Sequence, residues 1–152
     1  PDRKYVYLQN YSPRESVARY LDMYRDIALN RFGYEASSDR IGWGAPVYVA
    51  ETDEQAMEEQ WPNYLKMVGR IGKERGWTPP TKEGFIQECM YGSQYVGSPE
   101  TVARKITHAI KSVGAQRFDF KYANGPQKHS SLMKSLELYG TKVIPMVKEM
   151  LA

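Results

Sequence analysis

The residues of this chain best suited to chemistry lie close together, in the segment RFDFKYANGPQKH at positions 117–129. His129 titrates near neutral pH and could act as a general acid or base, or it could equally cap the next helix or lie on the surface. Asn124 and Gly125 readily adopt positive φ, so they could offer backbone N–H donors to a ligand or simply make a tight turn. The segment is therefore a candidate ligand-contacting loop, with a structural turn as the alternative.

Charged and aromatic residues alternate in RFDFKY, the first part of this segment. A period of two predicts a strand over 117–122, with Phe118 and Phe120 on one face. Asp119 and Lys121 then share the other face, where they could form a structural ion pair or contact a substrate or cofactor. Lys121 is therefore a candidate binding residue.

Several other chemistries lack the residues that they need. The 152 residues contain no nucleophile elbow, no carboxylate pair and no metal-ligand spacing. Cys89 is the only cysteine, which excludes a disulfide framework and favours a reducing, cytoplasmic setting. The net charge of +3 is small and the charges are interleaved, so no nucleic-acid partner is expected. No apolar run approaches the roughly 20 residues of a membrane span, so no membrane partner is expected either.

Cap and breaker residues predict the helices that must position these side chains. Ser12-Pro13-Arg14-Glu15 is typical of a helix start, and Gly33 is typical of the end of that helix. Thr52-Asp53-Glu54-Gln55 has the pattern of a capping box and predicts a second helix, interrupted at Pro62.

The segment Gly97-Ser98-Pro99-Glu100 could belong to a phosphate-binding loop or to a helix start. It lacks the spaced glycines and the lysine of a nucleotide loop, and Glu100 puts a negative charge where an anion would lie. We therefore predict a helix that begins here and ends at Gly114. A last helix is predicted over 131–150, with a kink near Pro145.

Strand-like runs at 5–8, 47–50 and 117–122 alternate with these helices, which predicts an α/β fold with three parallel strands. Residues 76–96 have no clear period and form an excursion or a lid. Three parallel strands leave two open edges, so partners must come from further sequence, from a second chain or from the excursion. Because the sequence starts abruptly with PDRKYVYLQN, we expect it to be a piece of a longer chain.

Four stretches of the sequence resemble stretches of one known protein family, and they occur in the same order as in that family. They are VYVAETDEQA at 47–56, YVGSPETVARKI at 95–106, GAQRFDF at 114–120, and a closing segment with Gly125, His129, SLEL at 135–138 and VIP at 143–145. Each is similar to the corresponding stretch of the luciferase-like flavin-dependent monooxygenases. Members of that family are (β/α)8 barrels that use reduced FMN, or a deazaflavin, on small organic substrates.

The resemblance implies that residues 1–152 are a single partial domain, the carboxyl-terminal part of a TIM barrel. It would comprise three parallel strands with their helices, an incomplete barrel in which 76–96 is an excursion or lid. Most of the flavin would then be bound by residues absent from this chain, so the isolated chain would be inactive.

In a β/α barrel the ligands bind at the carboxyl ends of the strands. Under the resemblance this rule selects cofactor- or substrate-binding candidates, which are Gln9, Asn10, Glu51, Lys121, Tyr122, Asn124 and Gly125. Tyr95, at the end of the excursion, is a further candidate as part of a lid that excludes water. No catalytic residue is assigned, and His129 is the one candidate. Some polar-substrate members carry an Arg-x-His pair where this chain has Gly44-Ala45-Pro46, so no mechanism can depend on that pair.

Two functions remain open at this stage. The first is part of a flavin-dependent monooxygenase that uses reduced FMN and O2 on a small organic substrate, with a flavin reductase as a partner. The second is a non-catalytic module for assembly or small-ligand binding, which would form homo-oligomers through its open sheet edges.

Overall fold

A parallel sheet forms the centre of the fold. The computed structural model describes residues 6–9, 14–37 and 41–152, with side chains from Val17 onward. The strands are β1 (Val6–Gln9), β2 (Ile41–Val49), β3 (Tyr95–Gly97) and β4 (Arg117–Lys121). β1 and β4 both pair with residues 42–44 of β2 and therefore flank it, whereas β3 pairs with residues 47–49. Every pairing is parallel, as the sequence predicts.

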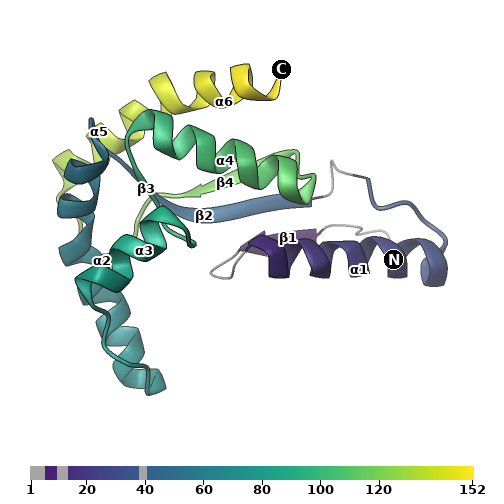
Figure 1. The fold of residues 1–152 in the computed structure, drawn as a ribbon, viewed down its shortest axis with the longest axis horizontal. Coiled ribbons are helices and arrows are strands. Elements are labelled where there is room, and N and C mark those ends of the chain that lie inside the picture. Colours follow the sequence, from purple (N-terminus) through teal and green to yellow (C-terminus); the bar gives the residue numbers. More distant parts are fainter. Residues whose placement is uncertain (1–5, 10–13, 38–40) are drawn as a thin grey trace.

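Helices follow each strand (Figure 1). They are α1 (Arg14–Phe32), α2 (Asp53–Arg75), α3 (Lys82–Met90), α4 (Pro99–Val113), α5 (His129–Leu138) and α6 (Ile144–Leu151), with a π-helical turn, η2 (Tyr139–Val143), between the last two. Two predicted caps are confirmed, because Thr52 accepts a hydrogen bond from the Gln55 N–H and Ser98 accepts one from the Thr101 N–H. The cap predicted at Ser12 lies outside the described residues.

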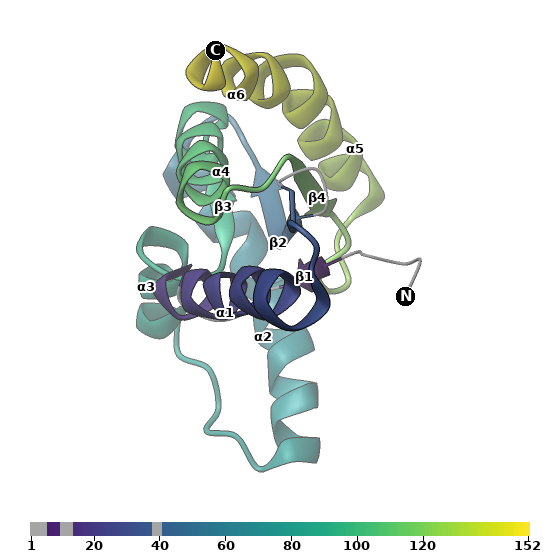
Figure 2. The same ribbon diagram turned by 90° about the vertical axis from the view of Figure 1, so that its right-hand side faces the viewer.

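Two hydrophobic clusters lie on opposite faces of the sheet. The odd-numbered residues of β2, from Ile41 to Val49, pack with α1, α4 and the α5–α6 segment. Phe118 and Phe120 of β4 lie against the same cluster, so the predicted facing of this strand is confirmed. Tyr48, on the other face of β2, packs with α2 and α3. Figure 2 shows α4, α5 and α6 on one side of β2 and β4, with α2 and α3 on the other.

The sheet differs from the prediction in two places. β2 begins at Ile41 rather than near Val47, so Gly44, Ala45 and Pro46 lie inside the strand and not before it. These residues have low strand propensity, but all three pair with β4, and Gly44 pairs with β1 as well, which fixes them in extended form. β3 was not predicted at all, since it has three residues and no pattern of its own. The described residues thus form four strands where three were expected.

The helices also differ in detail. α2 continues through Pro62 instead of stopping there, and it ends with Gly76 in the left-handed conformation. The last helix bends as expected, because the π-helical turn η2 comes directly before the turn that holds Pro145. The predicted excursion at 76–96 contains α3 and β3, so much of it is regular structure.

The sheet is open along both outer strands. Within the described residues, β1 and β4 each have β2 as their one neighbouring strand. An unpaired parallel edge is a surface that proteins normally cover. None of the described helices has the length and apolar character needed to cross a membrane.

Candidate functional site

The carboxyl ends of the parallel strands lie beside the first half of α2 and the start of α5 (Figure 1). Val49 and Gly97, the last residues of β2 and β3, pair with each other. β4 ends slightly earlier, with Lys121 opposite Pro46. In open and closed α/β sheets this edge is where ligands bind, so we describe the polar groups gathered here.

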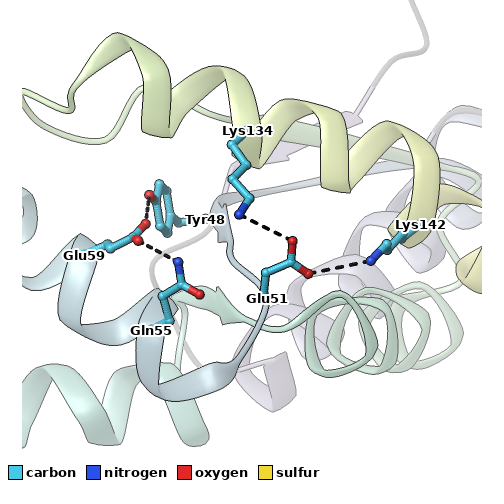
Figure 3. A network of polar contacts seen from close by, with 6 residues as sticks. All are labelled: Tyr48, Glu51, Gln55, Glu59, Lys134 and Lys142. Atoms are coloured by element: carbon cyan, nitrogen blue, oxygen red, sulfur yellow. Dashed lines mark hydrogen bonds and ion pairs between the residues drawn. The ribbon is translucent and has the colours of Figure 1, made fainter.

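A buried tyrosine forms a short polar contact at this edge (Figure 3). Tyr48 is 2% exposed, and its hydroxyl donates a 2.5 Å hydrogen bond to Oε2 of Glu59 on α2. Gln55 donates to the other carboxylate oxygen of Glu59 at 2.8 Å. Burial, followed by the hydrogen bond and negative charge of Glu59, raises the pKa of Tyr48 far above its ordinary value. The hydroxyl therefore remains a hydrogen-bond donor at every physiological pH and is a poor acid.

A small cavity of about 180 Å³ adjoins this group. Its walls include Tyr48, Glu59, Ser131 and Lys134, which come from β2, α2 and α5. Ligand sites for small organic molecules usually measure about 300 to 1,000 Å³, so this cavity is too small for a substrate. Its polar lining suits a few water molecules better.

Glu51, a predicted ligand contact, joins two elements of the protein. Its carboxylate lies 3.4 Å from Nζ of Lys134 on α5 and 3.6 Å from Nζ of Lys142 on η2 (Figure 3). All three side chains are about half exposed, and such pairs usually contribute between 0 and about 1 kcal/mol each. The structure thus places Glu51 in a bridge between the β2–α2 turn and the last helical segment.

The predicted loop at Asn124 and Gly125 docks onto α2. The Asn124 amide nitrogen donates to the Lys121 carbonyl at 2.6 Å, and Nε2 of Gln60 donates to the Asn124 carbonyl at 3.0 Å. Gly125 has the predicted positive φ of 96°, and it lies directly against the backbone of Asn63. Asn124 is 1% exposed, and its Oδ1 has no hydrogen-bond partner in the structure. The loop is therefore a connection to α2 held by the buried Asn124, with one unused acceptor.

Lys121 lies at the edge of a much larger cavity of about 590 Å³. The other walls come from the second half of α2 and from the segment between α3 and β3. This volume falls within the range typical of small-molecule sites. Tyr122, the next residue, is half exposed, and its ring lies 6.2 Å from that of Phe120.

Two further predicted site residues, Tyr95 and His129, do not line this cavity. Tyr95 is buried in the cluster under α4, where the Trp43 indole N–H donates to its hydroxyl at 3.2 Å. His129 is the first residue of α5 and is exposed. Gln9 ends β1 opposite Gly44, and Asn10 lies outside the described residues.

Sequence reasoning missed Tyr48, Glu59 and Gln60 as polar residues of this region. Gln60 had a detectable signal, because it lies four residues after the buried Ala56 and so falls in the apolar stripe of α2. The others meet only through the tertiary fold. No group of three or more potential metal ligands occurs within the described part of the chain.

Several solved structures with this arrangement are monooxygenases. No family profile matches the sequence, and no curated protein sequence matches it. Monooxygenase RslO1 from Streptomyces bottropensis superposes with a TM-score of 0.72 at 20% identity, over 93% of this chain and 41% of its own. The oxygenating constituent of 3,6-diketocamphane monooxygenase from Pseudomonas putida, solved in complex with FMN, gives 0.64 at 19% identity, over 93% of this chain and 42% of its own.

A long-chain alkane monooxygenase gives a TM-score of 0.60 at 17% identity, over 96% of this chain and 36% of its own. The described chain thus has the fold of part of these monooxygenases and spans about two-fifths of their length. At these identities the likeness establishes the fold.

Proposed function

We propose that this chain is the carboxyl-terminal portion of a luciferase-like, flavin-dependent monooxygenase that uses reduced FMN and O2 on a small organic substrate. The observation that carries the proposal is the likeness of nearly the whole chain to monooxygenases, one of them solved with FMN. The open sheet supports it as well, because β1 and β4 each have a free edge that further barrel strands would cover.

The described residues fit the ring of a flavin better than its phosphate. The cavity beside Lys121 offers apolar and aromatic walls, with Gln94 as a buried hydrogen-bonding group, which suit a flavin ring or a substrate that lies against it. The start of α4, the segment most like a phosphate loop, is already occupied, because Asp53 accepts hydrogen bonds from the Ser98 N–H and the Thr101 hydroxyl. We therefore propose that residues outside this chain bind the phosphate.

In this proposal the bound reduced flavin supplies the electrons for the reaction with dioxygen. This chain contributes Lys121 and the docked loop at Asn124 and Gly125, which would orient ligands at the carboxyl edge of the sheet. The helical cover provided by α2 and α3 would keep water away from that edge. A flavin reductase would supply reduced FMN, and a deazaflavin is an alternative cofactor.

An anaerobic titration with reduced FMN, followed by the change in flavin absorbance, tests this proposal on the complete protein that contains this chain. We expect saturable binding, weakened several-fold in Lys121→Met. Lys128→Met is the matched control, because Lys128 is an exposed residue of the loop that follows β4. We expect its affinity for reduced FMN to be unchanged. Absence of saturable binding by the wild-type protein would remove the proposal.

The second candidate is a non-catalytic module that forms homo-oligomers through β1 and β4. The same two open edges favour it, since a second copy could cover them. Sedimentation velocity separates the two candidates. The module must form a stable oligomer that fails to bind flavin, whereas a monomer that binds reduced FMN supports the enzyme.

A further inference from the structure

The large cavity beside Lys121 has one continuous apolar wall. Tyr64, Met67, Val68 and Ile71 line it from α2, and their spacing places them on a single face of that helix. Trp77, which is 51% exposed, continues the wall beyond the end of the helix. A helix normally buries such a stripe against the core. Here part of the stripe faces about 590 Å³ of space that a small molecule could fill.

The rest of the cavity lining is polar, but most of its polar groups already have partners. Glu88 accepts hydrogen bonds through Oε2 from the backbone N–H of Ser93 at 2.9 Å and from its hydroxyl at 3.0 Å. Neither Glu88 nor Ser93 therefore needs a ligand for hydrogen bonding.

Gln94 is the exception among these polar residues. It lines the cavity and is 3% exposed, and its Oε1 has no hydrogen-bond partner in the structure. A buried acceptor without a donor costs on the order of 1 to 3 kcal/mol. The terminal torsion of a glutamine is soft, so the amide can turn its oxygen toward the cavity without leaving its rotamer. A ligand with a donor would recover this lost hydrogen bond.

We propose that this cavity binds a compact, largely apolar organic molecule that donates one hydrogen bond to Oε1 of Gln94. Its apolar body lies along Tyr64, Met67, Val68 and Ile71. As a statement about the substrate, the inference rests on the proposed monooxygenase function. As a statement about binding, it depends only on the cavity.

The test uses two probes of nearly the same shape, indole and 1-methylindole, of which only indole has an N–H donor. Their affinities for the protein are measured by titration under NMR, from shifts of the backbone amides of α2. We expect indole to bind about five to ten times more tightly, the equivalent of one hydrogen bond. In Gln94→Met the affinities should become equal. Gln87→Met, an exposed glutamine of α3, is the matched control and should keep the preference.

A cavity-filling variant covers the case in which Gln94→Met does not fold. Val68→Trp adds bulk from the half-buried face of α2, and we expect it to weaken both probes at least tenfold. Equal binding of the two probes by the wild type, absence of binding, or a preference that survives Gln94→Met would overturn the inference. Binding that survives Val68→Trp would do the same.

The probes also separate this inference from the proposed function. If indole binds as expected but reduced FMN does not, the cavity stands and the monooxygenase proposal fails. If reduced FMN binds but the probes do not, only the proposal that this cavity binds a small molecule fails.

Discussion

Gly125, in the loop after β4, lies so close to the backbone carbonyl of Asn63 that a Cβ atom would overlap it. The two residues belong to segments far apart in the sequence, the β4–α5 loop and the middle of α2. Hydrogen bonds from Gln60 to the Asn124 carbonyl and from Gln127 to the Gln60 side chain hold the same junction. This contact fixes α2 beside the end of β4, and it thereby forms the cavity next to Lys121.

Gly125→Ala should destabilise the protein by about 2 kcal/mol or more. The positive φ of 96° is unfavourable for alanine, and the new methyl group would force the loop away from α2. Urea unfolding measures the change. Gly69→Ala is the control, since its Cβ meets nothing within 4 Å and it lies inside a helix, so we expect a gain of about 0.5 to 1 kcal/mol. A destabilisation by Gly125→Ala of clearly less than about 2 kcal/mol would contradict a tight contact between this loop and α2.

Lys105→Met should cost about 2 to 3 kcal/mol. The ammonium group of Lys105 donates to the carbonyls of Cys89 and Gln94, each at 2.6 Å, and lies 5.0 Å from the ring centre of Tyr95. Its loss leaves carbonyl groups at the end of α3 without their charged donor. Thermal and urea unfolding report the change. Lys111→Met, which removes one exposed contact to the Met150 carbonyl, should cost less than about 1 kcal/mol, and equal losses would contradict the assignment.

Asp53→Asn should destabilise the protein at neutral pH and much less in acid. Burial alone would raise the pKa of Asp53, but the hydrogen bonds from Ser98 and Thr101 and the charge of Arg104 outweigh it and lower the pKa. A lowered pKa gives stability that is present above the ordinary Asp value and is lost as the pH falls through the lower, folded value. The free energies of unfolding of wild type and variant should therefore differ by about 1 to 2 kcal/mol at pH 7 and converge as the pH falls through the lowered pKa of Asp53. A difference that is constant with pH would argue against the ionised contact.

Ionisation of the Cys89 thiol should lower the free energy of unfolding as the pH rises into the alkaline range. Burial, opposed by the nearby charge of Lys105, raises the pKa of its thiol from 9.0 to about 12. A raised thiol pKa contributes stability below the unfolded value, and this is lost as the pH rises toward 12. Tyr48 and Tyr139 also have raised pKa values, so both proteins lose stability as the pH rises above 9, but the wild-type free energy of unfolding should fall more steeply than that of Cys89→Ala. Parallel profiles for the two proteins would mean that the thiol ionises as easily folded as unfolded.

Local signals in the sequence were sufficient for most helix ends. Thr52, Ser98, Gly33 and Gly114 act through neighbours within a few residues, and the structure shows the expected caps and the expected positive φ at both glycines. Alternation in RFDFKY likewise identified β4 and the face that packs against the core. These features could be predicted because their physical cause lies within a few residues of each position.

The missed features depend on long-range contacts. β2 contains Gly42, Gly44 and Pro46, and it is extended because β4 pairs with all three and β1 pairs with both glycines. The hydrogen bond between Tyr48 and Glu59 requires α2 to fold back beside β2, and that between Gln60 and Asn124 spans 64 positions. The cavity beside Lys121 likewise exists only once α2 has docked. Sequence reasoning selected Lys121 correctly as lying at the strand end but gave no indication of its neighbours.

The central claim is that β1 and β4 are the outer strands of an arc that further strands of the same protein complete. Hydrogen exchange of the backbone amides in β4, measured by NMR on the complete protein, tests this most directly. If neighbouring strands cover both edges, all amides of Arg117–Lys121 should exchange slowly, and a tenfold dilution should not change their rates. Fast exchange at alternate residues, or protection that disappears on dilution, would contradict the claim.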